Sequence, residues 1–252
     1  MTKDEQVFLH HMNDIASRSY YEGRPCFSDF MSMYEQDLLL KHQDDILKDT
    51  GAEGLFLSGG YPHAERVLAA FGAFEPEGWP ALWLHITPAY PKFSAVPGHR
   101  DYLGSILGLG LKREKIGDIL VQDDGAWIYV RRETSDFILE ELKQVGRTIV
   151  RIQAEDLPEA YRMPRFSVSR KTVSSVRLDT IIAAAYGLSR SKAVQCITDG
   201  EVFINGRMIT GNSHAVKSGD VISVRHKGKF VFVDLQNKSK KNKCIIEIRK
   251  YV

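Results

Sequence analysis

Hydroxyl and cationic side chains stand together at the start of a predicted helix that begins near residue 189. Ser189, Arg190, Ser191 and Lys192 would occupy its first turn, where backbone N–H groups lack partners within the helix and the helix dipole is positive. Each cation there costs about 0.3 to 1 kcal/mol at low salt. The arrangement makes sense if an anion such as a phosphate binds the side chains and the free N–H groups; in the alternative, both cations reach into solvent.

More cations follow in the last third of the chain. Period-2 alternation after Asp220 predicts a strand over 221–226 and places Arg225 and Lys227 on one side of it. Further cations stand before the first helix of this region and on either side of the strand. We expect these residues to converge on one RNA backbone, and the predicted RNA-binding set is Arg177, Ser189, Arg190, Lys192, Lys217, Arg225, Lys227 and Lys229.

The charge of the chain is unevenly distributed. Residues 165–252 hold 17 Lys and Arg against 6 Asp and Glu, a net charge of +11, whereas residues 1–164 hold 17 against 26, a net charge of −9. A dense basic block attached to an acidic body is typical of a module that binds a polyanion, because each neutralised phosphate releases counterions. Composition alone also allows a solvated lysine-rich tail.

Two short helices and a small sheet must position these cations. Apolar stripes predict helices over 177–186 and 189–197, with Gly187 ending the first. Asn205-Gly206 favours a two-residue hairpin turn, and Ser218-Gly219-Asp220 favours a second turn before the strand.

The first two thirds of the chain read as helices followed by alternating strands and helices. Apolar periodicity predicts one helix over 5–21 and another from a cap at Ser28 toward Asp49. Short apolar runs predict strands at 55–57, 82–86, 119–121, 127–130 and 149–152, and the helices between them are predicted over 64–71, 100–109 and 134–142. This order is typical of a ferredoxin-like or RNA-recognition-like α/β domain.

The fold class that follows is α+β with three parts. We predict a helical N-terminal segment (1–50), the ferredoxin-like or RNA-recognition-like domain (51–157), a linker (158–174), and a domain of two helices packed on a small β-sheet (175–252).

Aromatic residues are frequent in the predicted strands of the middle domain. Trp79, Trp83, Trp127 and Tyr129 could stack on RNA bases if the sheet exposes them. The glycine-aromatic signature of RNA-recognition strands is missing, which favours core packing instead.

The C-terminal region resembles the S-four type of RNA-binding domain, named for a protein of the small ribosomal subunit. The resemblance rests on Arg177-Leu178-Asp179, Leu188-Ser189-Arg190-Ser191, Asp199-Gly200 with Val202, Asn205-Gly206, and Ser218-Gly219-Asp220 with Val224-Arg225. It implies that the two helices and the adjoining loop dock on structured RNA. The positions that match the family's contacts are Arg177, Ser189, Arg190, Lys192 and Arg225.

The whole chain resembles the YlmH family of bacterial proteins. The signature in the middle of the chain is 98–104 (GHRDYLG) followed by 109–118 (LGLKREKIGD). The resemblance implies that the protein binds the large ribosomal subunit through ribosomal RNA and acts on stalled peptidyl-tRNA complexes during rescue. It also implies that the gene lies beside division genes. Arg100, Lys112, Arg113 and Lys115 could form a second RNA contact, or a solvated loop.

Several classes of function are not expected. Cys26, Cys196 and Cys244 form no CxxC pair and have no nearby histidines, so neither a zinc site nor a disulfide framework is indicated. We predict no metal, no cofactor and no enzyme activity. No apolar run approaches 18 residues and no secretory leader is recognisable, which predicts a cytoplasmic protein without membrane insertion.

Two alternatives remain open at this point. One is an RNA-modifying enzyme that the basic module targets to its substrate. The other is a division-associated scaffold, whose acidic N-terminal body binds a protein partner.

Overall fold

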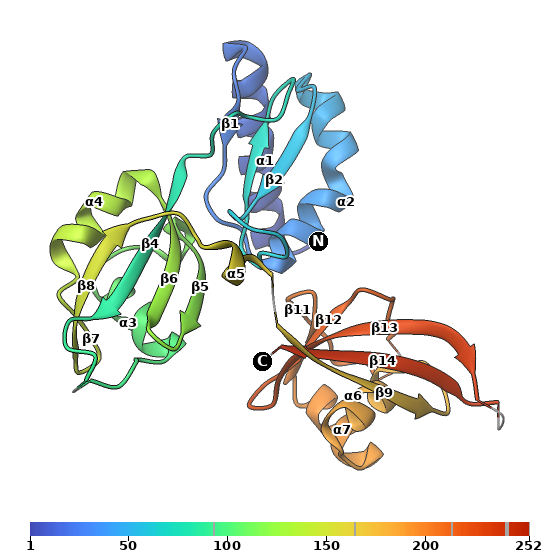
Figure 1. Ribbon diagram of the computed structural model, residues 1–252. Helices are drawn as coiled ribbons and strands as arrows, with labels where there is room; N and C mark the ends of the chain where they lie inside the picture. The colour runs from blue at the N-terminus through green and yellow to red at the C-terminus, as the bar shows by residue number, and fades with distance from the viewer. Residues whose placement is uncertain (93, 164, 213, 240–241, 252) are drawn as a thin grey trace. The chain divides into compact units, whose positions relative to one another are not determined.

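The computed structural model describes residues 1–92, 94–163, 165–212, 214–239 and 242–251. The chain divides into two units, Met1–Met163 and Pro164–Val252, which are considered separately (Figure 1). The predicted linker over 158–174 includes Pro164, which lies outside the described residues.

The N-terminal helices α1 (Lys3–Glu22) and α2 (Met33–Thr50) lie side by side. Each begins with a reciprocal capping box, Thr2 with Glu5 and Ser32 with Glu35, and each ends at a glycine in the left-handed conformation. The predicted helices are confirmed, but the predicted cap at Ser28 is wrong. Ser28 is instead buried, and its Oγ accepts the N–H of Ala69 at 2.8 Å.

A small antiparallel sheet accompanies these helices. It consists of β1 (Cys26–Phe27), β2 (Leu55–Ser58) and β3 (Leu68–Phe71), in the order β1-β3-β2. The helix predicted over 64–71 is therefore wrong. All four residues of β3 are buried, and pairing on both edges in the core overrides the helical preference of its two alanines.

The second sheet of unit 1 is antiparallel and has the strand order β5-β6-β4-β8-β7. Its elements are β4 (Ala81–Pro88), α3 (His99–Gly108), β5 (Ile116–Gln122), β6 (Gly125–Arg131), α4 (Arg132–Glu141), β7 (Gln144–Val145) and β8 (Thr148–Ala154), with a 3-10 turn at Arg113–Lys115 and a short α5 (Glu159–Arg162) after β8. The predicted strands at 82–86, 119–121, 127–130 and 149–152 are confirmed.

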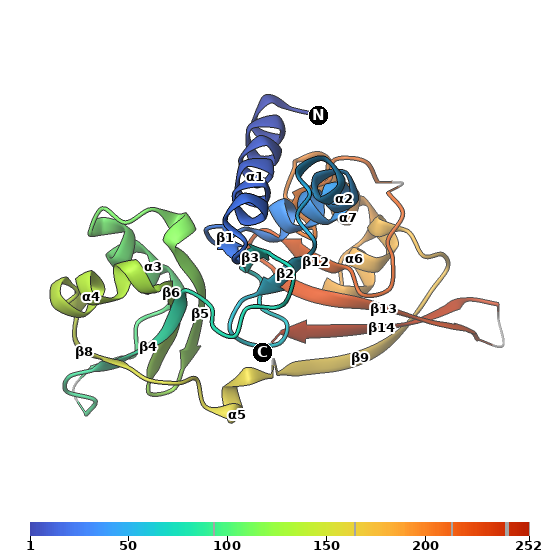
Figure 2. The same cartoon turned by 90° about the horizontal axis from the view of Figure 1, so that it is seen from above.

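Both faces of this sheet are covered. One face packs against α3 and α4, where Tyr102 and Ile138 join a core with Leu84 and Ile128 (Figures 1 and 2). On the other face, an aromatic cluster is buried against residues that come from the N-terminal layer and from the segment after β8. The buried members of this cluster are Phe30, Leu68, Ala81, Trp83, Trp127, Tyr129 and Leu157. Core packing of the middle aromatic residues is thus confirmed.

The C-terminal unit is a six-stranded antiparallel sheet with two helices. Its elements are β9 (Phe166–Val173), α6 (Leu178–Tyr186), α7 (Arg190–Thr198), β10 (Val202–Ile204), β11 (Arg207–Met208), β12 (Val221–Val224), β13 (Gly228–Lys238) and β14 (Cys244–Tyr251). The strand order is β11-β10-β12-β13-β14-β9. Figure 2 shows β13 and β14 as a long hairpin with β9 alongside β14.

One face of this sheet packs against the two helices. Leu178 and Ile181 of α6 and Ile197 of α7 are fully buried with Phe230 and Ile248 of the sheet. The two helices and the Asn205-Gly206 turn, where both residues have positive φ, are as predicted.

Eight of the 17 residues predicted as a linker, 166–173, form a strand. β9 pairs with β14 from Phe166↔Tyr251 to Cys244↔Val173. Exposed polar residues on both sides of this edge strand obscure its periodicity in the sequence, and its paired residues lie 71 to 85 positions later in the chain. The stretch 166–173 therefore belongs to the C-terminal unit.

Candidate nucleic-acid interface

A buried carboxylate connects the two helices of the C-terminal unit. Asp179 is 1% exposed in the first turn of α6. Its Oδ1 accepts a hydrogen bond from Nε of Arg177 at 3.1 Å, and its Oδ2 accepts one from Nε of Arg190 at 2.8 Å. The arginine side chains remain 41% and 61% exposed. Asp179 therefore orients two guanidinium groups that face solvent.

Electrostatics keep this carboxylate charged. Burial by itself raises the pKa of Asp179, but the hydrogen bonds from Arg190 and Arg177 outweigh burial and hold the pKa below its ordinary value. The position is at the helix start, as its sequence suggests, yet its role in holding both arginines was not predicted. The signal in the sequence is an acid on the buried stripe of a helix, two residues after a predicted RNA-binding arginine.

The start of α7 is built as the sequence predicts. Ser189 is the N-cap, and its Oγ accepts the N–H of Lys192 at 3.3 Å. No acidic residue lies in the first turn of this helix, and the side chains of Arg190 and Lys192 are exposed. Cations and backbone N–H groups thus share one helix end, which suits an anion.

Lys227 is near Lys192, but not through the predicted strand. β12 ends at Val224, and Arg225, His226 and Lys227 form the turn to β13, with His226 at φ 63°. The chain reverses before the period-2 pattern can reach Lys227, so the predicted strand face is wrong there. Lys227 instead lines a surface depression with Lys192, together with Leu188, Gln195, Cys196, Asp199 and Glu201.

Arg225 and Lys229 lie on the opposite face of the sheet from α6 and α7. Phe230 is buried on the helix side of the sheet, so Lys229, the residue before it, points to the other side. Ser223 pairs with both Lys229 and Phe203 and therefore shares their face. The guanidinium of Arg225 lies 5.4 Å from the ring centroid of Phe203. The prediction that all eight residues converge is therefore wrong. Alternate residues of a strand point to opposite faces, and Arg225 and Lys229 are on the face away from the helices.

Lys217 and Lys227 lie at opposite ends of β12. Lys217 is in the turn before this strand, where its N–H donates to Asp220 at 2.7 Å, and Lys227 is in the turn after it. The group that the structure brings together is Arg177, Ser189, Arg190 and Lys192, with Lys227 beside Lys192.

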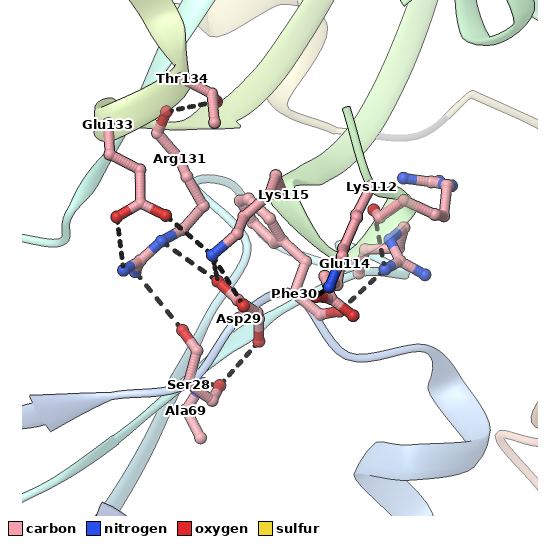
Figure 3. Close-up of polar contacts among 12 residues, drawn as sticks. Ser28, Asp29, Phe30, Ala69, Lys112, Glu114, Lys115, Arg131, Glu133 and Thr134 are labelled. Carbon is pink, nitrogen blue, oxygen red and sulfur yellow. Dashed lines mark hydrogen bonds and ion pairs between the residues drawn. The ribbon is translucent and has the colours of Figure 1, made fainter. Parts of the chain in front are cut away.

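In unit 1, two of the four cations of the predicted second RNA contact are held by internal contacts. Lys115 donates from Nζ to Asp29 at 2.9 Å and to Glu133 at 2.8 Å, and Arg131 pairs with the same Asp29 at 3.5 Å (Figure 3). The hydrogen bonds to Glu133 and Asp29 raise the pKa of Lys115 although burial opposes this. The cluster connects the N-terminal layer to the second sheet.

Arg113 is part of the same connection. It donates from Nη1 to the carbonyls of Ile116 and Gly117, the latter at 3.1 Å. Burial, reinforced by the nearby Arg66, lowers the pKa of Arg113 to about 10. Arg66 itself donates to the carbonyls of Phe30 and Ile116.

Asp118, the last residue of the signature, completes this junction between the N-terminal layer and the second sheet of unit 1. It accepts hydrogen bonds from the N–H of Glu65 at 2.7 Å, the N–H of Arg66 at 3.1 Å and the hydroxyl of Tyr61 at 2.9 Å. Much of the signature at 109–118 therefore fastens one layer of unit 1 to the next. The second RNA contact stays a prediction that now rests on the exposed Arg100 and on Lys112, which is exposed and pairs with Glu114 at 3.7 Å.

Comparison with known proteins agrees with this architecture. A family described as "Putative RNA-binding domain in YlmH" matches residues 84–159, and the S4 domain matches residues 176–222. The chain is 30% identical over 254 aligned positions to the ribosome-associated protein quality control protein P2 of Bacillus subtilis (strain 168), covering 96% of this chain and 93% of that protein. The chain belongs to the YlmH family.

Two further similarities are narrower. The small ribosomal subunit protein uS4A of Clostridium novyi (strain NT) is 40% identical over 55 residues, which are 21% of this chain and 27% of that protein. A solved structure, described as the cell division protein ylmH from Streptococcus pneumoniae, matches this YlmH family member with a TM-score of 0.51 and 22% identity. It covers 62% of this chain and 93% of that chain, and it shows the fold alone.

Across the described ranges, no helix is long and apolar enough to cross a membrane. In that same part of the chain, no group of three or more His, Cys, Asp and Glu residues is placed to hold a metal ion.

Proposed function

We propose that the protein is a non-enzymatic factor that binds ribosomes by gripping structured ribosomal RNA with its C-terminal unit. The observation that carries the proposal is the group around Asp179, which presents Arg177 and Arg190 beside the N-terminus of α7. Oriented guanidinium groups bind phosphates through paired hydrogen bonds, and free N–H groups at a helix end add to them.

The family membership supports the ribosomal partner. The relative in Bacillus subtilis is named as ribosome-associated and as a quality control protein. Two proteins that this chain matches over 55 and 54 residues are named as proteins of the small ribosomal subunit. We propose that this protein, too, acts in the cytoplasm in translation quality control, on the large subunit and in contact with tRNA on stalled complexes.

Salt dependence tests the RNA-binding role. If about five phosphates are neutralised, the slope of log K against log salt should be roughly −3.5 to −4.5 for binding to large subunits. Arg190→Glu with Lys192→Glu removes two such contacts and should flatten that slope by roughly 1.4 to 1.8. The matched control is Lys48→Glu with Lys143→Glu, two exposed lysines of unit 1. An unchanged slope in the first double variant would overturn the proposal.

Separate measurements test the choice of ribosomal subunit, the contact with tRNA and the absence of enzyme activity. Co-sedimentation with purified large subunits, small subunits and large subunits carrying peptidyl-tRNA should show strongest binding to the last. Equal binding to both subunits would contradict the large-subunit assignment. Mass analysis of ribosomal RNA from cells without the protein should show every modification retained; a lost modification would favour the RNA-modifying alternative.

A further inference from the structure

The face of the C-terminal sheet that points away from α6 and α7 carries a continuous row of side chains. Paired residues of neighbouring strands share a face, and the recorded register runs Met208↔Phe203↔Ser223↔Lys229. The row continues through Tyr251, whose ring contacts Lys229, to Phe166, which pairs with Tyr251. The row therefore crosses all six strands.

The rings in this row are accessible and accompanied by cations. Phe203, Tyr251 and Phe166 are partly exposed. The ammonium of Lys229 lies 4.6 Å from the ring centroid of Tyr251, and the rings of Phe166 and Tyr251 are 4.9 Å apart, edge to face. Arg225 lies over Phe203 as described above.

A hollow opens in the middle of the row. Its volume is about 380 Å³, and its lining includes Phe203, Ser223, Arg225 and Lys229. Phe203 and Lys229 stand on the strands that flank β12, which places them roughly 10 Å apart. Ser223 lies between them on β12 and is too small to fill the space. The hollow is open to solvent, and its lining combines the ring of Phe203 with the cations of Arg225 and Lys229.

Positive charge extends along the same face. Arg170 and Arg249 lie on β9 and β14, and the carboxylate of Glu247 between them accepts hydrogen bonds from both, at 3.4 and 2.8 Å. The hydrogen bond from Arg249, and then that from Arg170, hold the pKa of Glu247 below its ordinary value despite some opposing effect of burial. The acid on this face is thus neutralised by arginines, and the remaining cations complement a polyanion.

We propose that this face binds unpaired bases of single-stranded RNA, with one base inserted in the hollow between Phe203 and Lys229. Sequence-tolerant binding of single strands combines aromatic rings, on which bases stack, with cations that follow the backbone. A duplex hides the faces of its bases and could not use the rings. The inference rests on the proposed RNA-binding function but assigns it a second surface. Lys229, Tyr251 and Phe166 lie outside the residues that match the S4 domain.

Fluorescence anisotropy with the full chain tests this inference. The probes are a labelled uridine dodecamer and a labelled RNA duplex with the same number of phosphates. Phe203→Leu with Tyr251→Leu should weaken binding of the dodecamer at least about fivefold, and up to about 100-fold, because each stacked base contributes that range. Binding of the duplex should stay within about twofold. Phe203→Tyr should retain the affinity for the dodecamer, and Val168→Ala on the same face is the matched control.

The outcomes separate this inference from the proposed function. Unchanged dodecamer binding in the double variant, or an equal loss for both probes, overturns the inference. The salt slope of Arg190→Glu with Lys192→Glu tests the other surface independently. A second measurement is photo-crosslinking of a dodecamer that contains 4-thiouridine. Adducts on peptides with Phe203 or Tyr251 support the inference, and adducts confined to α7 overturn it.

Discussion

The two large sheets of this protein are alike in plan but differ in what covers their second face. Each is antiparallel and packs helices against one side. In unit 1 the other side is buried, with Trp83, Trp127 and Tyr129 all 6% exposed or less. In the C-terminal unit the corresponding aromatic rings are partly exposed and have cations over them. An aromatic sheet is thus a candidate for base stacking only where its own unit leaves the rings exposed.

The cations of the two units differ in the same way. Arg66, Arg113 and Lys115 donate to carbonyls and carboxylates within unit 1, so they serve its internal junction. Arg190 is fixed by one hydrogen bond to Asp179 while most of its side chain stays in solvent. Counting charges along the sequence cannot separate these roles, because the partners lie far apart in the chain.

The largest effect is expected from removing the acid that closes the junction. Asp118→Ala deletes the acceptor of three half-buried hydrogen bonds. Because hydrogen bonds to a charged group contribute about 1.5 to 3 kcal/mol each, the free energy of unfolding of unit 1 should fall by about 3 to 5 kcal/mol. All three tryptophans lie in unit 1, so urea titration followed by tryptophan fluorescence reports it. Asp44→Ala, an exposed acid of α2, is the control. A loss below about 0.5 kcal/mol would mean that the junction is not what holds the layers.

A smaller effect is expected where the chain covers the aromatic face. Gly60 has a φ of +81°, and a Cβ at this position would lie 2.8 Å from the ring of Tyr129. Gly60→Ala should destabilise unit 1 by about 1 to 3 kcal/mol through strain and overpacking. The same titration measures it, with Gly78→Ala as control because nothing lies within 4 Å of that position. Equal midpoints for both variants would show that the cover is loose.

At the start of α6, Asp179→Asn separates the effect of arginine orientation from the effect of charge. The variant gains positive charge, which favours RNA, but loses the charge-assisted hydrogen bonds that hold Arg177 and Arg190. We expect the loss of orientation to dominate and weaken binding to large subunits about tenfold, which corresponds to about 1.4 kcal/mol. Asp199→Asn makes the same change of charge at the exposed end of α7. Tighter binding by both variants would show that charge alone matters.

The smallest effect is a pH dependence of the junction. The hydrogen bond from Lys115 lowers the pKa of Glu133, so its contribution is present above about 4.3 and is lost as the pH falls through the lowered value. The pKa of Lys115 is raised, so its contribution is present below about 10.4 and is lost at higher pH. Since Glu133 is 54% exposed, we expect less than about 1 kcal/mol.

Urea midpoints measured between pH 3 and 5 (about one unit either side of the ordinary glutamate pKa) should show this dependence in the natural protein. Lys115→Met should reduce it, whereas Lys143→Met at an exposed site should not. A dependence that survives in the Lys115 variant would assign it to other acids.

The sequence predicted the elements whose signals are local. The Ser189 cap of α7, Gly187 at the end of α6 and the Asn205-Gly206 turn depend on neighbouring residues, and the structure has them as predicted. β3 and β9 were missed because pairing with distant strands decides their conformation. Spacing and resemblance predicted that Arg177, Ser189, Arg190 and Lys192 belong together. The predicted strand face shared by Arg225 and Lys227 failed because β12 ends before it reaches them.

The buried acid of α6 also affects the entropy of recognition. A long arginine side chain loses up to about 2 kcal/mol of rotamer freedom when it is immobilised, and such losses ordinarily oppose association. Because Asp179 already restrains Arg177 and Arg190 in the unliganded protein, much of that loss accompanies folding of the unit. RNA then meets a surface that is ordered in advance, and a slower dissociation of the complex is the expected consequence.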